Sequence, residues 1–100
     1  MNTAYNMLEN FIPVRNALKV REDGNFLIAA NHEKEIFYLN STAREFWEFI
    51  DGNINIDSIC EKFLCEYDIN RDSLENDLVN LLRDLQWKKL IRLKIGGDLS

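Results

Sequence analysis

Residues 35–52, EIFYLNSTAREFWEFIDG, decide the fold of this chain because they predict a strand and a helix joined by a very short turn. The strand, residues 35–39, is rich in the aromatic and β-branched side chains that favour a half-buried sheet. We expect Thr42 and Glu45 to form a capping box at the helix start, and Asp51-Gly52 to end the helix. The helix has one apolar stripe with helical spacing, formed by Ala43, Phe46, Trp47 and Ile50.

Two further strands are predicted before this segment. Residues 14–21 alternate between apolar and basic side chains, as in a strand with one face in water. Asp23-Gly24 is a strong hairpin signal, and residues 26–30 form a continuous apolar run typical of a more buried strand. With the polar connection at residues 31–34, the three strands predict an antiparallel meander.

Two further helices are predicted after it. Asn55 is the expected cap of the first, whose apolar stripe runs from Ile56 to Tyr67. The second is expected from about Ser73 to Lys88, with Asp72 and Glu75 as a capping box. Its apolar stripe consists of Leu74, Leu78, Leu81, Leu82 and Leu85.

The order of three strands and then three helices predicts an α+β fold. The last two helices and the hairpin resemble a winged helix-turn-helix. Residues 1–12 are expected to be an N-terminal arm, residues 13–95 the domain, and residues 96–100 a flexible tail. Within the domain, residues 91–95 alternate as in a short terminal strand, and Trp87 lies off the apolar stripe of the last helix.

The composition excludes several classes of function. One hundred residues suffice for one domain with one core. A formal net charge of −5 argues against a general binder of nucleic acid or of anionic membranes. The sequence contains neither a run of about 18 apolar residues nor a secretory signal pattern, so we expect a cytoplasmic protein.

The sequence also lacks a convincing catalytic or metal-binding constellation. Its one histidine, His32, falls in a predicted turn, and Cys60 and Cys65 are spaced so as to point about 140° apart on a helix. No zinc pattern and no glycine-rich phosphate loop is present. We therefore expect no enzyme activity, no metal and no cofactor.

The strand at residues 35–39 is the best remaining candidate for function, because an outer strand of the meander exposes backbone N–H and C=O groups. An extended peptide could add to that edge, unless the N-terminal arm or a partner in a homodimer covers it. The alternative is a winged-helix DNA-binding regulator. It is disfavoured because the last helix carries Glu75, Asp77 and Asp84 on surfaces that would meet phosphates.

The sequence resembles the PqqD family, known from coenzyme PQQ synthesis, and more broadly the RiPP recognition element. The resemblance covers about residues 13–91. It depends on the Leu39-Asn40-Ser41-Thr42-Ala43 turn, on Asp51-Gly52, and on the start of the next helix. In the last helix and its exit it depends on Leu74, Asp77, Leu78, Leu82, Leu85, Leu90 and Ile91.

This resemblance implies a peptide chaperone that binds the leader of a ribosomally made precursor peptide. The leader would lie as an added strand against the third strand and the last helix. The chaperone would deliver it to a modifying enzyme such as a radical SAM protein. The residues implied are Ile36, Phe37, Tyr38 and Leu39 on the strand, and Asp77, Leu78, Leu81, Asp84 and Lys88 on the helix.

Several of these residues have a second interpretation. Successive strand residues face opposite sides, so only one of the pairs Ile36/Tyr38 and Phe37/Leu39 can face the helices. Leu78 is interpreted mainly as core, which makes Leu81 the better groove candidate.

Overall fold

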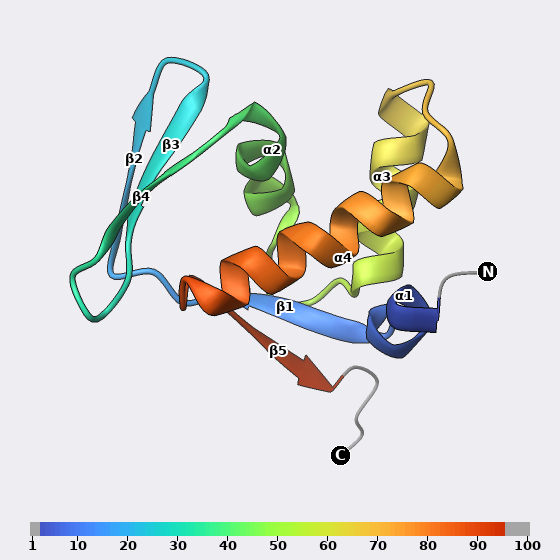
Figure 1. Ribbon diagram of the computed structural model, residues 1–100, viewed down its shortest axis with the longest axis horizontal. Coiled ribbons are helices and arrows are strands. Elements are labelled where there is room, and N and C mark those ends of the chain that lie inside the picture. The colour runs from blue at the N-terminus through green and yellow to red at the C-terminus, as the bar shows by residue number, and fades with distance from the viewer. Residues whose placement is uncertain (1–2, 96–100) are drawn as a thin grey trace.

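The computed structural model of the protein describes residues 3–95 and consists, over that range, of two small sheets and four helices (Figure 1). The tail expected at residues 96–100 lies outside the described residues. In chain order the elements are α1 (Thr3–Leu8), β1 (Phe11–Arg15), β2 (Lys19–Asp23), β3 (Phe26–Ala30), β4 (Ile36–Leu39), α2 (Ser41–Phe49), α3 (Ile56–Glu66), α4 (Arg71–Trp87) and β5 (Ile91–Ile95).

The larger sheet is the predicted antiparallel meander, with strand order β2-β3-β4. The hairpin at Asp23-Gly24 forms as expected: Asp23 pairs with Phe26, and Gly24 has the positive φ of 62° that this tight turn requires. Strands β3 and β4 pair from Leu27 opposite Leu39 to Ala30 opposite Ile36. The expected α+β arrangement of a three-stranded antiparallel sheet followed by three helices is confirmed.

The single strand expected at residues 14–21 was wrong, because this segment contributes to two different sheets. Its first residues belong to β1, which pairs with β5 from Phe11 opposite Ile95 to Arg15 opposite Ile91. The chain then breaks at residues 16–18, and β2 begins at Lys19. The alternation of apolar and basic residues continues across the break, which is why the sequence pattern does not show it.

Asparagine side chains begin all three of the longer helices, α2, α3 and α4. Asn40 Oδ1 accepts a hydrogen bond from Ala43 N at 2.9 Å, Asn55 Oδ1 from Ser58 N at 2.8 Å, and Asn70 Oδ1 from Ser73 N at 3.0 Å. The cap expected at Asn55 is confirmed. The capping boxes expected at Thr42 and Asp72 were wrong by two residues, because each preceding asparagine takes the N-cap position.

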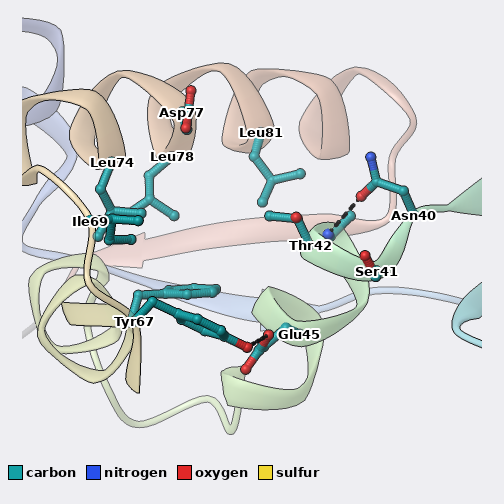
Figure 2. Close-up of a pocket in the computed structure, with 12 residues that line it drawn as sticks. Asn40, Ser41, Thr42, Glu45, Tyr67, Ile69, Leu74, Asp77, Leu78 and Leu81 are labelled. Atoms are coloured by element: carbon teal, nitrogen blue, oxygen red, sulfur yellow. Dashed lines mark hydrogen bonds between the residues drawn. The ribbon is translucent and has the colours of Figure 1, made fainter. Parts of the chain in front are cut away.

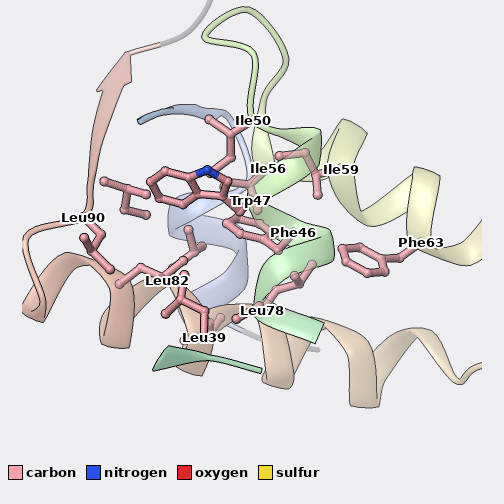
Figure 3. Close-up of a cluster of buried hydrophobic side chains, with 14 of the residues drawn as sticks. Leu39, Phe46, Trp47, Ile50, Ile56, Ile59, Phe63, Leu78, Leu82 and Leu90 are labelled. Atoms are coloured by element: carbon pink, nitrogen blue, oxygen red, sulfur yellow. The ribbon is translucent and has the colours of Figure 1, made fainter. Parts of the chain in front are cut away.

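The core lies between the larger sheet and the helices, and α2 is at its centre (Figure 3). Phe46 and Trp47 of α2 are buried beside Ile56 and Ile59 of α3, and α4 contributes its leucine stripe. From the sheet, Leu27, Ala29 and Leu39 face this core. The predicted helix stripes therefore face the core, except that Tyr67, expected at the end of the α3 stripe, is 45% exposed in the α3–α4 connection.

The N-terminal segment is part of this structure. Tyr5 of α1 is only 1% exposed, and its hydroxyl donates a hydrogen bond of 2.8 Å to Asp57 Oδ1 of α3. The boundary expected between residues 12 and 13 falls inside β1. Among residues 3–95, neither the arm nor β5 pairs with β4, because β1 and β5 pair with each other in a separate sheet. Over the described range, no helix is both long and apolar enough to cross a membrane.

Candidate functional site

Strand β4 is an edge of its sheet, because β3 is its only hydrogen-bonded neighbour among the described strands. Asn31 N donates to Glu35 O at 3.0 Å, immediately before β4 begins. Hydrogen-bonded pairs alternate along an antiparallel ladder, so Phe37 and Leu39 also bond toward β3, and Ile36 and Tyr38 turn their N–H and C=O groups outward. Ala30 lies opposite Ile36, and its carbonyl accepts a hydrogen bond from Leu18 N on the β2 side. The carbonyl of Ala30 therefore points away from β4, as this alternation requires.

The side chains of β4 divide as strand alternation requires. Leu39 is 2% exposed and belongs to the core, and Phe37 is half-buried against it. Ile36 and Tyr38 lie on the other face of the sheet, with exposed fractions of 67% and 62%. Phe37 and Leu39 therefore face the helices, whereas Ile36 and Tyr38 present outward backbone and solvent-exposed side chains.

One edge of α4 carries the helix residues that the sequence singled out. Asp77, Leu81, Asp84 and Lys88 recur at intervals of 4, 3 and 4, so they lie along one line of the helix surface. Leu81 is half-buried and Asp77 and Asp84 are exposed. Leu78, one step toward the core, is 2% exposed, which agrees with its interpretation as a core residue.

Lys88 brings the end of α4 into contact with β4. Its Nζ lies 2.7 Å from Asp84 Oδ2 and 5.4 Å from the centre of the Phe37 ring. The ammonium group is thus held between a carboxylate and an aromatic face, an arrangement that favours the cation. Phe37, Asp84 and Lys88 form one contact at this end of the site.

Asn31, which we had placed in a simple polar connection, fixes the separation between β4 and α4. It is fully buried, and its Nδ2 donates to Glu35 Oε1 and to the carbonyl of Lys88, both at 2.8 Å. Its Oδ1 accepts from the backbone N–H groups of Glu33 and Glu35. One side chain therefore ties the β3–β4 turn to the C-terminus of α4. Only the position of Asn31 at the end of an apolar strand hinted at this role.

A groove of about 580 Å³ lies along α4 from Leu74 to Leu81 and reaches Asn40 at the end of β4 (Figure 2). Figure 2 shows Leu78 and Leu81 projecting from α4 into it, with Tyr67 opposite and the first turn of α2 at one end. Tyr67 and Ile69, which belong to the α3–α4 connection, were not predicted as site residues. The groove is lined by Asn40, Ser41, Thr42, Ala43, Glu45, Phe63, Tyr67, Ile69, Leu74, Asp77, Leu78 and Leu81.

The charged groups at this groove are carboxylates. The hydroxyl of Tyr67 donates a hydrogen bond to Glu45, and this bond raises the pKa of Tyr67 above its ordinary value. Hydrogen bonding with Glu45 also raises the pKa of the neighbouring Glu66, because two carboxylates so close favour retaining a proton. The nearby Lys62 opposes this rise in pKa. The lining of the groove is mostly apolar, with Glu45 and Asp77 as its acidic residues.

These features describe a binding site. In the described range, no cluster of three or more His, Cys, Asp or Glu residues could hold a metal ion, and Cys60 and Cys65 are free thiols. His32 is exposed in the β3–β4 turn. The site instead combines outward backbone groups at β4 with an apolar, carboxylate-rimmed surface on α4.

Comparisons with known proteins identify a family and a similar fold. The family described as Coenzyme PQQ synthesis protein D (PqqD) matches residues 27–91, which include β3 from its second residue, β4 and all three longer helices. A solved structure described as TbiB1 in complex with the TbiA(beta) leader peptide is similar in fold. It has a TM-score of 0.70 and 19% sequence identity, over 87% of this chain and 98% of that one. No curated protein sequence matches this chain.

Proposed function

This chain belongs to the PqqD family, and we propose that it is a non-catalytic chaperone for a ribosomally synthesised precursor peptide. It binds the leader of that peptide as a strand added to β4 and presents it to a modifying enzyme, such as a radical SAM protein. We assign this activity to the cytoplasm, where ribosomes make such precursors.

The observation that carries this proposal is the outward backbone of Ile36 and Tyr38, on an uncharged edge strand whose Phe37 contacts Lys88 at the end of α4. Strand addition supplies affinity through main-chain hydrogen bonds and specificity through pockets for alternate side chains. Phe37 contacts the end of α4 through Lys88, and Leu81 lines the groove that reaches the β4–α2 turn. The structural neighbour TbiB1, which is described in complex with a leader peptide, supports the same use of the fold.

The acidic edge of α4 makes the DNA-binding alternative the weaker one. Asp77 and Asp84 are both exposed on the helix that would have to approach phosphates. The carboxylates would repel DNA, whereas a leader with basic residues would be attracted to them.

The direct test uses fluorescein-labelled synthetic peptides that copy the N-terminal segments of short reading frames beside the gene for this chain. We expect one of them to bind with a dissociation constant of about 1 μM or lower, which corresponds to at least ~8 kcal/mol. Leu81→Lys should weaken that binding about tenfold, because it replaces a half-buried apolar contact with a charge. Fluorescence anisotropy measures the affinity, and circular dichroism checks the fold.

Asn80→Lys is the matched control, because Asn80 is the exposed neighbour of Leu81 and the variant gains the same charge. It should bind like the wild type. Failure of every such peptide to bind, or an equal loss of affinity in both variants, would contradict the proposal.

A further inference from the structure

The groove of about 580 Å³ extends beyond the strand edge to which the leader is proposed to add. Asn40 links β4 directly to α2, and residues 40–43 together with Glu45 form one end of the groove. The opposite wall comes from Tyr67 and Ile69 of the α3–α4 connection (Figure 2). A peptide that follows β4 and continues past Leu39 therefore enters this groove.

The lining of the groove specifies the chemistry of a ligand. Its floor is made by leucines of α4, and Ile69 adds a side chain that is 43% exposed. The acidic residues among the lining residues are Glu45 and Asp77, and no lysine or arginine is among them. A volume of this size accommodates one large apolar side chain together with part of its neighbours.

Asp77 differs from the otherwise similar Asp84. Asp84 is neutralised by Lys88 at 2.7 Å, whereas Asp77 forms no ion pair with any residue between 3 and 95. Asp77 is also exposed at the mouth of the groove. Of the two carboxylates, Asp77 is the one available to a basic group on a ligand.

We propose that this groove is an anchoring subsite that takes a large apolar side chain of the leader, followed or preceded by a Lys or Arg that pairs with Asp77. This inference rests on the proposed function, since the anchor lies in the same peptide as the segment that adds to β4. Backbone hydrogen bonds alone do not distinguish one peptide sequence from another. The subsite would provide that selectivity through the side chains that it accepts.

The position of the subsite also relates the anchor to the direction of the added strand. The groove lies beyond the C-terminal end of β4. In an antiparallel addition, the N-terminal part of the peptide would therefore reach it, so that the anchor precedes the strand-forming residues. In a parallel addition, the anchor would follow them.

The experiment uses peptides selected from a random 16-residue library displayed on phage and panned on the wild-type protein. Each selected peptide is synthesised with a fluorescein label, and its affinity is measured for Ile36→Pro, Thr42→Trp, Ile69→Ala and Asp77→Lys. We expect the peptides to share an apolar residue next to a Lys or Arg. Thr42→Trp should weaken binding at least about tenfold by filling the groove from an exposed position.

Two controls separate the subsite from general effects on the protein. Ser58→Trp places the same side chain on an exposed position of α3 outside the groove, and it should bind like the wild type. Asp77→Lys should weaken binding about threefold to tenfold, whereas Asp72→Lys, exposed on another side of α4, should not. Replacing the basic peptide residue with Glu should restore binding to Asp77→Lys.

The outcomes distinguish this inference from the proposed function. If selected peptides depend on Ile36 but are unaffected by Thr42→Trp, Ile69→Ala and Asp77→Lys, the subsite is overturned and strand addition stands. If no selected peptide depends on Ile36, strand addition fails and the subsite fails with it. Ile69→Ala, a truncation of an exposed side chain, keeps the test valid should Thr42→Trp fail to fold.

Discussion

Strands β2 and β4 are the two edges of one sheet, yet they differ in every property that matters for adding another strand. Both pair with β3 on one side only. All five residues of β2, KVRED, are exposed and four of them are charged. The four residues of β4, IFYL, carry no charge, and two of them are packed toward the helices.

This difference explains why β4 is suited to pairing with an added strand and β2 is not. Charged side chains along an edge disfavour pairing with another chain, because a partner strand would have to approach and partly desolvate them. The hairpin that contains β2 is also fastened to α2, since Arg44 contacts Glu22 at 3.0 Å and the carbonyl of Gly24 at 2.7 Å. At β4, in contrast, no side chain is charged, and Phe37 contacts Lys88 at the end of α4.

The largest effect should come from placing proline at equivalent positions of the two edges. Ile36→Pro removes an outward N–H and puts a ring where the added strand would bond, so we expect at least about a hundredfold weaker peptide binding, or ~2.7 kcal/mol. Fluorescence anisotropy with a bound leader peptide measures this loss. Tyr38→Pro should behave in the same way, since its N–H also points outward.

Val20→Pro is the control on β2. Lys19 lies opposite Ala30, whose carbonyl points to β2, so alternation turns the N–H of Val20 away from β3. The ladder therefore tolerates a proline there, and peptide binding should be unchanged. Equal losses in Val20→Pro and Ile36→Pro, with native circular dichroism in both, would mean that the added strand does not distinguish the two edges.

Local patterns predict those parts of the molecule that depend on local interactions. The stripes of α2, α3 and α4, the Asp23-Gly24 hairpin and β4 follow from periodicity and turn chemistry, and the structure has them where they were expected. The family also follows from the sequence, because short motifs at the β4–α2 turn and at the start of α3 carry it.

Contacts between segments distant in the chain could not be predicted in this way. The break at residues 16–18 exists because β1 pairs with β5, whose paired residues lie 76 to 84 positions later, which no local pattern reveals. Asn31 is polar and lies in a turn, so burial by the end of α4 is visible only in the fold. Similarly, Tyr67 and Ile69 line the groove only because α3 and α4 bring their connection opposite the first turn of α2.

The next largest effect should come from Asn31, which holds the β3–β4 turn against α4. Asn31→Ala leaves the carbonyl of Lys88 and the N–H groups of Glu33 and Glu35 without their partner in a buried place. We expect the free energy of unfolding to fall by about 2 kcal/mol, and peptide affinity to fall as β4 loses its position beside α4. Urea denaturation and fluorescence anisotropy measure the two quantities.

Asn25→Ala is the corresponding change in the turn between β2 and β3, where Asn25 is exposed. It should change the free energy of unfolding by less than about 0.5 kcal/mol. A similar loss in both variants would show that the two turns contribute alike, and that the attachment of β4 to α4 is not specific to Asn31.

The smallest effect should come from removing the charges that keep β2 closed. The double variant Lys19→Thr/Arg21→Thr retains side chains that favour strands and loses both cations of β2. We expect self-association through that edge to strengthen by up to about tenfold, or ~1.4 kcal/mol, as measured by sedimentation velocity over a range of protein concentrations. The net charge changes from −5 to −7 because two cations are lost, so general repulsion between copies grows. Stronger association despite that repulsion would therefore identify the edge as the cause.

Lys62→Thr/Arg83→Thr is the control, because it loses the same charge from α3 and α4. It should associate no more than the wild type. Equal association in the two double variants would refute a protective role for the β2 charges.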